Sequence, residues 1–242
     1  MAQWRMGPGS DEYCMRIRNL PIIVLSFSAD CMAETPLVRL SPETALDWIK
    51  AGNDRHMAGR YVHWHQSVER RRQVAASQRP HAAVLSCSDS QVPPEIVFDQ
   101  GLGDLYVVRI AGNALADKEL GSIEHAVSAL GVPLVVVLGH QRCSAVEAAL
   151  RGQPADGHFA SVASALSAAV ARGRSHYGDK VDHAIRWNIT FAADRLRRSE
   201  PILAGLVRSG RVRVVEAYYS PDSGAVFWLE SSGRDPAVAV LR

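Results

Sequence analysis

Three short apolar segments constrain the fold of this chain more than any other feature of its sequence. They are the runs His81–Ser86, Leu105–Arg109 and Leu134–Leu138. Unbroken apolar runs of this length are typical of strands that are covered on both faces. Between the second and third runs, residues 122–130 place apolar side chains at helical spacing, which gives that segment one apolar face. Strand, helix and strand in this order predict a parallel crossover, and hence an α/β fold.

Further elements extend this prediction to a single domain over residues 34–242. Ser41 is a hydroxyl N-cap and Pro42 stands at the first helical position, so a helix is expected from there to Gly52. No linker is long enough to divide the chain. The expected architecture is a mostly parallel central sheet flanked by helices. The remaining predicted elements are two helices, Phe159–Ala171 and Val181–Arg198, and a closing hairpin-like pair, Val212–Tyr219 and Ala225–Leu229.

Residues 1–33 have the layout of a disordered start followed by a secretory signal peptide. A short basic stretch precedes the apolar run Leu20–Ala29, and small residues follow it. Cleavage would fall before Glu34, and Met15 rather than Met1 would be the start. The run is too short to span a bilayer, which takes about 20 apolar residues. We therefore expect export, to the periplasm; the alternative is an N-terminal strand or arm that packs on a partner subunit of a cytoplasmic protein.

Composition excludes several classes of protein. The chain has 27 Lys and Arg against 25 Asp and Glu, a net charge of +2. That balance argues against a nucleic-acid binder, because such proteins normally carry a basic face or tail. Four cysteines in 242 residues are too few for a disulfide scaffold. Cys14 and Cys31 lie in the N-terminal segment, so the mature chain would keep only Cys87 and Cys143.

The two remaining cysteines stand where two of the predicted strands end. Cys87 and Asp89 follow the first strand, and His140 and Cys143 follow the third. Ligands bind beyond the carboxyl ends of parallel strands, so neighbouring strands would gather these four side chains into one cluster. Two thiolates and one imidazole, with a carboxylate or water in the fourth position, form a zinc site. The alternatives are two small buried hydrophobic residues, or a disulfide that would leave the histidine and the carboxylate unexplained.

A longer series of motifs surrounds this cluster and covers the chain from about Leu40 to Leu229. Its members are Cys87-Ser88-Asp89-Ser90, Val92-Pro93-Pro94-Glu95, Gly103-Asp104-Leu105, Arg109 with Ala111-Gly112-Asn113, Ser122-Ile123-Glu124, and His140 with Cys143. The series resembles the beta-class carbonic anhydrases. The resemblance implies a zinc enzyme that hydrates CO2 reversibly to bicarbonate and a proton, on a mostly parallel sheet. It also implies a homodimer, or a larger assembly such as a homotetramer, in which an N-terminal helical arm lies over the partner.

The resemblance assigns roles at the metal. It implies that Cys87, His140 and Cys143 hold Zn²⁺ and that a zinc-bound hydroxide attacks CO2. Asp89 would accept a hydrogen bond from that hydroxide, and in the closed form of some members it would become the fourth zinc ligand. Asp89 is therefore expected to act both as a catalytic residue and as a metal ligand.

The resemblance also places a substrate pocket, onto Gln78 and Tyr106. Two departures from the family pattern are expected to line the same pocket. Ser144 follows the zinc cysteine where the family usually has glycine, and it could add a hydroxyl near the metal. His125 stands where some members have tyrosine. It could relay protons, because the ordinary pKa of histidine is about 6.5; the alternative is a helix histidine that bonds to the backbone.

The largest departure is Gln91, since the family pattern Cys-x-Asp-x-Arg has arginine at this position. An arginine grips the aspartate in a charge-assisted pair and keeps it away from the metal. Gln91 is neutral and would restrain Asp89 far less. We therefore expect Asp89 to spend more time on the metal, and the activity to be weakened.

Two other functions remain open at this point. One is a zinc hydrolase that acts on a CO2 analogue such as carbonyl sulfide or carbon disulfide. The other is a catalytically silent homologue that binds zinc and serves as a binding or sensing module. Gln91 keeps the silent homologue open, because it replaces a residue that the family's reaction uses.

Overall fold

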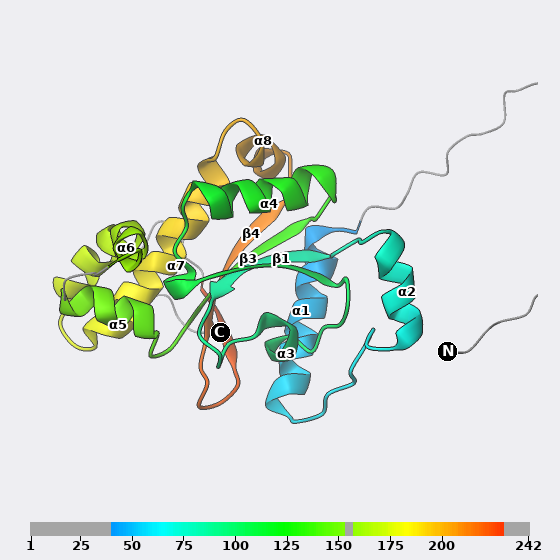
Figure 1. Ribbon diagram of the computed structural model, residues 1–242, viewed down its shortest axis with the longest axis horizontal. Coiled ribbons are helices and arrows are strands. Elements are labelled where there is room, and N and C mark those ends of the chain that lie inside the picture. Colours follow the sequence, from blue (N-terminus) through cyan, green and yellow to red (C-terminus); the bar gives the residue numbers. More distant parts are fainter. Residues whose placement is uncertain (1–39, 153–156, 230–242) are drawn as a thin grey trace, which may run out of the picture. The chain divides into compact units, whose positions relative to one another are not determined.

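The computed structural model describes residues 40–152 and 157–229, which belong to one compact unit (Figure 1). The expected signal peptide and its cleavage site lie outside the described residues. Within them, no helix combines the length and the apolar character needed to cross a membrane.

A five-stranded sheet in the order β2-β1-β3-β4-β5 forms the centre of the fold. β1 pairs in parallel with β2 and β3, β3 pairs in parallel with β4, and β5 is antiparallel to β4. The mostly parallel sheet is therefore confirmed. The strands are β1 (Ala82–Cys87), β2 (Leu105–Ile110), β3 (Leu134–His140), β4 (Arg213–Tyr219) and β5 (Val226–Leu229).

Burial differs between the three strands that the apolar runs predict. Every residue of β1 and β3 is buried, as expected for strands with neighbours on both sides. β2 lies at the edge of the sheet, and its side chains are half-buried apart from the exposed Arg109. The expectation of a third fully buried strand is therefore wrong for this single chain. An edge strand has only one neighbour, and an apolar run does not reveal how many neighbours a strand has.

Helices cover the sheet on more than one side. α7 packs on β3 and β4, α4 contacts β1 and β2, and α1 contacts β3. Figure 1 shows α4 above the strands and α3 below them. The helices are α1 (Pro42–Met57), α2 (Val68–Ala76), α3 (Pro94–Val97), α4 (Asp117–Ala129), α5 (Ser144–Arg151), α6 (Phe159–Arg174), α7 (Lys180–Arg198) and α8 (Leu203–Arg208), with a 3-10 turn η1 at Ala111–Asn113.

The first helix begins as predicted but does not end at Gly52. The hydroxyl of Ser41 caps it by accepting a hydrogen bond from the Thr44 backbone at 3.1 Å. The helix then continues through Gly52 to Met57. A Cβ on Gly52 would lie 1.8 Å from the carbonyl oxygen of Phe98, so this glycine permits close packing at the end of α3. It is a packing position inside the helix rather than its end.

Candidate metal centre

Four potential metal ligands meet at the carboxyl ends of β1 and β3. Cys87 is the last residue of β1 and His140 the last residue of β3, and these strands are neighbours in the sheet. Asp89 follows β1 by two residues, and Cys143 is the N-cap of α5. The four candidate ligand atoms all lie within 4.8 Å of one another. The structure thus gathers the four side chains that the sequence places at two strand ends.

A sharp turn after β3 brings Cys143 back to the cluster. The backbone N–H of Gln141 donates to the carbonyl of Tyr219 at 2.9 Å. Arg142 then takes a left-handed conformation with φ +56°, so that the chain reverses into α5. Its guanidinium forms two hydrogen bonds, 2.8 and 2.6 Å long, with the carboxylate of Asp222 in the β4–β5 turn. Arg142 thus adopts a strained backbone conformation that turns Cys143 back toward His140, and its ion pair with Asp222 supports this conformation.

The two cysteine sulfurs lie side by side without a disulfide. Both thiols are free and buried, and their Sγ atoms are 3.7 Å apart. The Cys87 sulfur accepts hydrogen bonds from the backbone N–H of Gly112 at 3.2 Å and of Asp89 at 3.4 Å. Backbone donors aimed at a sulfur stabilise its thiolate form.

The two thiols differ in acidity because they share one hydrogen bond. The pKa of Cys87 is lowered, chiefly by the hydrogen bond from Cys143 and also by His140 and the Asp89 N–H, against the opposing effect of burial. The pKa of Cys143 is raised, since this thiol donates the bond to Cys87 and is itself buried. The pair therefore releases one proton readily and holds the other, unless a cation balances the second negative charge.

His140 presents an unpaired nitrogen to the cluster. Its side chain is fully buried, and its Nδ1 lies 3.0 Å from the carbonyl oxygen of Gln141. A proton on Nδ1 leaves the lone pair on Nε2, the tautomer of a metal-ligating histidine. Nε2 is buried and has no hydrogen-bond partner among the described residues. Asp89 Oδ2 lies 3.4 Å from it.

These donors fit a zinc ion. An unpartnered buried nitrogen is costly, and metal ligation would satisfy it. Two sulfurs bound to a tetrahedral zinc at about 2.3 Å would lie about 3.8 Å apart, close to the observed separation. Thiolate and imidazole ligands also favour zinc, whereas magnesium and calcium prefer oxygen ligands.

The Asp89 carboxylate stands on the more exposed side of the cluster. Ser144 donates to it through both its backbone N–H and its hydroxyl. Arg109 fixes the loop beneath, because its guanidinium donates to the carbonyl oxygens of Cys87 at 2.9 Å and Asp89 at 2.7 Å. Gln91 reaches elsewhere: its Nε2 lies 3.4 Å from His140 Nδ1.

Comparison with known proteins decides which family this arrangement belongs to. A family model described as carbonic anhydrase matches residues 82–226, which span all four candidate ligands. The chain belongs to the carbonic anhydrase family. Its similarity to solved beta-class structures places it in the beta class, and reversible hydration of CO2 is the reaction of that family.

The carbonic anhydrase relatives cover most of the chain. "Carbonic anhydrase 2" of Mycobacterium tuberculosis is 39% identical over 188 residues, which is 76% of this chain and 91% of the relative. The beta-carbonic anhydrase CafA of Aspergillus fumigatus has a TM-score of 0.61 at 27% identity, over 70% of this chain and 84% of CafA. A tetrameric beta-carbonic anhydrase of Sordaria macrospora shares the fold with a TM-score of 0.61 at 20% identity, over 78% and 94%.

Three pocket residues expected from the carbonic anhydrase resemblance lie far from the metal cluster within one chain. Tyr106 pairs with Ala83 in the sheet, whereas Cys87 pairs with Ile110. Four residues of parallel strand separate the two levels, or about 13 Å. The Tyr106 ring lies 6.4 Å from the exposed His125 on α4, and its hydroxyl is 3.1 Å from that of Ser122. These residues belong to the amino ends of the strands.

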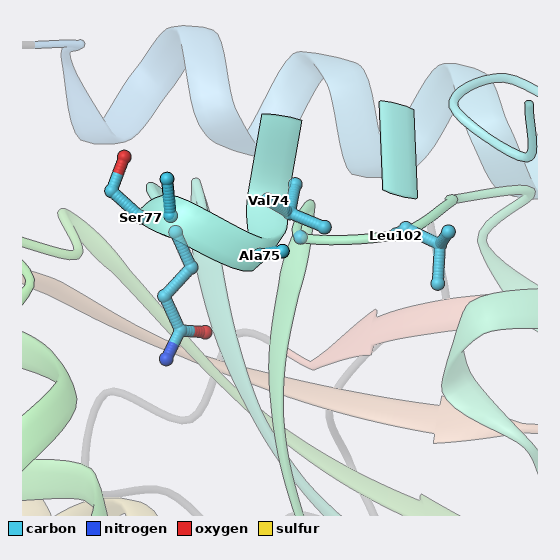
Figure 2. Close-up of a pocket in the computed structure, with 7 residues that line it drawn as sticks. Val74, Ala75, Ser77 and Leu102 are labelled. Atoms are coloured by element: carbon cyan, nitrogen blue, oxygen red, sulfur yellow. The ribbon is translucent and has the colours of Figure 1, made fainter. Parts of the chain in front are cut away.

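Gln78 lies in the same part of the carbonic anhydrase chain as Tyr106. It is exposed just before β1 and lines an open hollow of about 410 Å³. Figure 2 shows Val74, Ala75, Ser77 and Leu102 around this hollow. Of the four expected pocket residues, only Ser144 lies at the metal cluster of its own chain.

Two contributors to the carbonic anhydrase site were not singled out from the sequence. Arg109 anchors the loop after β1, and the Gly112 N–H supports the Cys87 sulfur. Both residues belong to the motif series that resembles the family, but the motifs do not indicate what either residue does. The residue type does not reveal where a backbone N–H points, so the contribution of Gly112 is visible only in the folded structure.

Proposed function

We propose that this chain catalyses the zinc-dependent, reversible hydration of CO2 to bicarbonate and a proton. The carrying observation is the buried, unpartnered Nε2 of His140, which faces two cysteine sulfurs and a carboxylate in a member of the beta-class carbonic anhydrase family. Cys87, His140 and Cys143 would hold the ion. When bound, zinc acidifies a coordinated water, so that a nucleophile for CO2 is available near neutral pH.

The remaining residues around the cluster hold its side chains in place and orient the reacting groups. Asp89 offers carboxylate oxygens on the side that reaches solvent, since its side chain is 23% exposed while that of His140 is fully buried. There it can accept a hydrogen bond from the attacking group and orient it toward CO2. Arg109 and Ser144 fix the loop and the carboxylate. His140 is oriented by the carbonyl of Gln141.

We expect Gln91 to lower the activity without abolishing it. Its amide nitrogen lies near His140 Nδ1 and forms no hydrogen bond with Asp89 among the described residues. Asp89 therefore lacks a cationic partner at this position, and its carboxylate faces the metal ligands. Gln91→Arg should raise the CO2 hydration rate by drawing the carboxylate outward. An unchanged or lower rate, with the metal content intact, would contradict this expectation.

Stopped-flow CO2 hydration combined with metal analysis tests the main proposal. One zinc per chain with turnover supports carbonic anhydrase activity. One zinc per chain without turnover on CO2, but with turnover on carbonyl sulfide or carbon disulfide, would show the hydrolase. Zinc without turnover on any of these substrates would show the silent homologue.

We further propose that two copies of the chain build the substrate pocket together, as a homodimer or homotetramer. Gln78, Tyr106 and His125 lie toward the amino ends of the strands, whereas the metal cluster of the same chain lies at the carboxyl ends. A second copy can supply them, because a two-fold interface pairs each site with a partner's surface. His125 would then stand where it can pass a proton to solvent.

Subunit mixing tests this shared pocket. Cys143→Ser and Gln78→Ala variants are each expected to be impaired when alone. In the hybrid dimer, one site combines an intact metal cluster with an intact Gln78 from the partner. After full exchange of equal amounts, activity should recover to about a quarter of the wild-type value. No recovery would mean that Gln78 acts within its own chain or not at all.

The proposal of export to the periplasm rests on the sequence layout of residues 1–33. N-terminal sequencing of the purified protein tests it. Glu34 as the first residue supports export, whereas Met1 or Ala2 contradicts it.

A further inference from the structure

Ser144 makes more contacts with the Asp89 carboxylate than any other described residue. Its hydroxyl lies 2.8 Å from Oδ1 and 3.1 Å from Oδ2, and its backbone N–H lies 3.1 Å from Oδ2. We propose that Ser144 is the positioning residue for Asp89, holding the carboxylate toward the metal ligands in place of residue 91. This inference rests on the proposed function, because it concerns how the same metal centre is arranged.

The position of Ser144 in the fold makes it suitable for this role. It is the first residue of α5, directly after the metal-ligating Cys143. The N–H groups of a first helical turn lack partners within the helix, and the helix dipole favours a negative charge there. Asp89 therefore binds the start of α5 through a side-chain donor and a backbone donor together. The hydroxyl adds a directional contact that a residue without a polar side chain would lack.

No other described side chain donates a hydrogen bond to this carboxylate. Arg109 binds the backbone carbonyl of Asp89 and not its side chain. Gln91 lies at His140 Nδ1, on the opposite side of the imidazole from Nε2. The His140 Nε2 atom itself is 3.4 Å from Oδ2 and is the group that ligates metal. Two tasks are thus divided: Ser144 holds the aspartate, and Gln91 contacts the metal-ligating histidine.

The direction of the hold follows from which oxygen is bonded. The Ser144 hydroxyl makes its shorter contact with Oδ1, at 2.8 Å, and the backbone N–H donates to Oδ2 at 3.1 Å, so the two donors hold both oxygens. Oδ2 is also the oxygen that lies 3.4 Å from His140 Nε2. Ser144 therefore fixes Asp89 with Oδ2 turned into the cluster. A carboxylate held there shields the metal from competing ligands, so weakening the hold should expose the metal to a chelator.

A double-mutant cycle on the metal-loaded protein tests the proposal through the rate of zinc loss to excess EDTA. Ser144→Ala removes both hydroxyl contacts and leaves the backbone N–H. We expect it to speed zinc loss by about tenfold, in line with losing hydrogen bonds to a charged group. Asp89→Ala should speed it at least as much, and the double variant should lose zinc no faster than Asp89→Ala. Ser144→Thr keeps the hydroxyl and should stay within about twofold of wild type.

Two further measurements make the test specific. Ser128→Ala removes an exposed hydroxyl that bonds only within α4, and it should leave the zinc-loss rate unchanged. For kcat/KM of CO2 hydration, the effect of Ser144→Ala should vanish in the Asp89→Ala background. An unchanged zinc-loss rate in Ser144→Ala, or a full additional effect in the double variant, would overturn the proposal. A chain that binds zinc but hydrates no CO2 would refute the proposed function alone, because the EDTA measurement needs no turnover.

Discussion

The two ends of the parallel strands differ in how much of the candidate site one chain supplies. At the carboxyl ends, the donor atoms of Cys87, Asp89, His140 and Cys143 lie within 4.8 Å of one another, and three of these residues are buried. At the amino ends, Gln78 is exposed beside an open hollow and Tyr106 is half-buried on an edge strand. At the carboxyl ends, one chain supplies all four candidate metal ligands. At the amino ends, the expected pocket residues have no candidate metal cluster beside them in the described part of the same chain.

This difference has a physical origin in the sheet. Parallel neighbours such as β1 and β3 end at the same edge, so residues that follow them converge on one point. The positions of the candidate metal ligands are therefore fixed by the fold of a single chain. The amino-end residues sit on the edge strand and on segments next to it, where a second molecule can approach. Metal binding is thus expected to survive changes that abolish the proposed shared pocket.

The largest effect is expected from Cys143→Ser at the carboxyl ends. Zinc affinity should fall by well over about a hundredfold, because loss of an outer-shell partner alone costs 10–100-fold. CO2 hydration should fall to the uncatalysed rate. Metal analysis and stopped-flow kinetics measure both quantities. Stoichiometric zinc in this variant would show that the cysteine is not a ligand.

A smaller effect, confined to the amino ends, is expected from Gly101→Ala. A Cβ there would lie 2.0 Å from the Trp64 carbonyl oxygen and 2.8 Å from the His65 Cβ, so the loop before α2 must shift. Such overpacking costs about 1–3 kcal/mol of unfolding free energy, measured by urea titration. Zinc content should stay at the wild-type level.

Gly121→Ala is the matched control for this glycine substitution. Gly121 lies within α4, and an added Cβ would meet no atom within 4 Å. Alanine favours a helix interior over glycine by about 1 kcal/mol, so this variant should be as stable as wild type or more so. A Gly101→Ala protein as stable as wild type would contradict the predicted overpacking. Loss of zinc in this variant would show that the two ends of the strands are not independent.

The smallest effect is expected in the acid stability of the segment that leads to α2. Burial raises the pKa of Asp99, but hydrogen bonds from Arg55 and from the N–H groups of Val62 and His63 outweigh it, so that the net pKa is lowered. A lowered carboxyl pKa contributes stability above the unfolded-state value of about 3.9, and this contribution is lost as the pH falls below it. Asp99→Asn should therefore lower Tm at pH 6 and lessen the further loss of Tm between pH 5 and 3.

Asp47→Asn serves as the control for that profile. Asp47 is exposed on the same helix as Arg55. Its substitution should leave the dependence of Tm on pH as in wild type. Equal profiles for Asp99→Asn and wild type would show that the buried pair does not govern acid stability.

The strands and the metal cluster could be predicted from sequence because both depend on local patterns. Apolar runs give β1 and β3, and cysteine or histidine at each strand end gives the cluster. The end of α1 could not be predicted, because Gly52 looks like a helix stop until Phe98 is seen against it. Whether Gln91 or Ser144 holds Asp89 was also out of reach, since side-chain orientation decides it.

The location of the pocket residues shows a different limit. A motif position tells which family residue Gln78 or Tyr106 corresponds to, but not which copy of the chain it serves. Sequence order carries no information about partners that lie across an interface. The same holds for β2, whose half-buried side chains give no sign in the sequence of an open edge.

The ion pair between Arg142 and Asp222 joins positions 80 residues apart, and it holds a left-handed residue between two candidate metal ligands. In evolutionary terms, these two positions are coupled, because each side chain is useful only when the other is present. A change at residue 222 alone would remove this ion pair and leave the turn before Cys143 held by the hydrogen bond from the Gln141 N–H to the Tyr219 carbonyl, whereas a glycine at residue 142 would make the carboxylate dispensable. Close homologues are therefore expected to covary here, with an acid at 222 where 142 is basic and free variation where 142 is glycine.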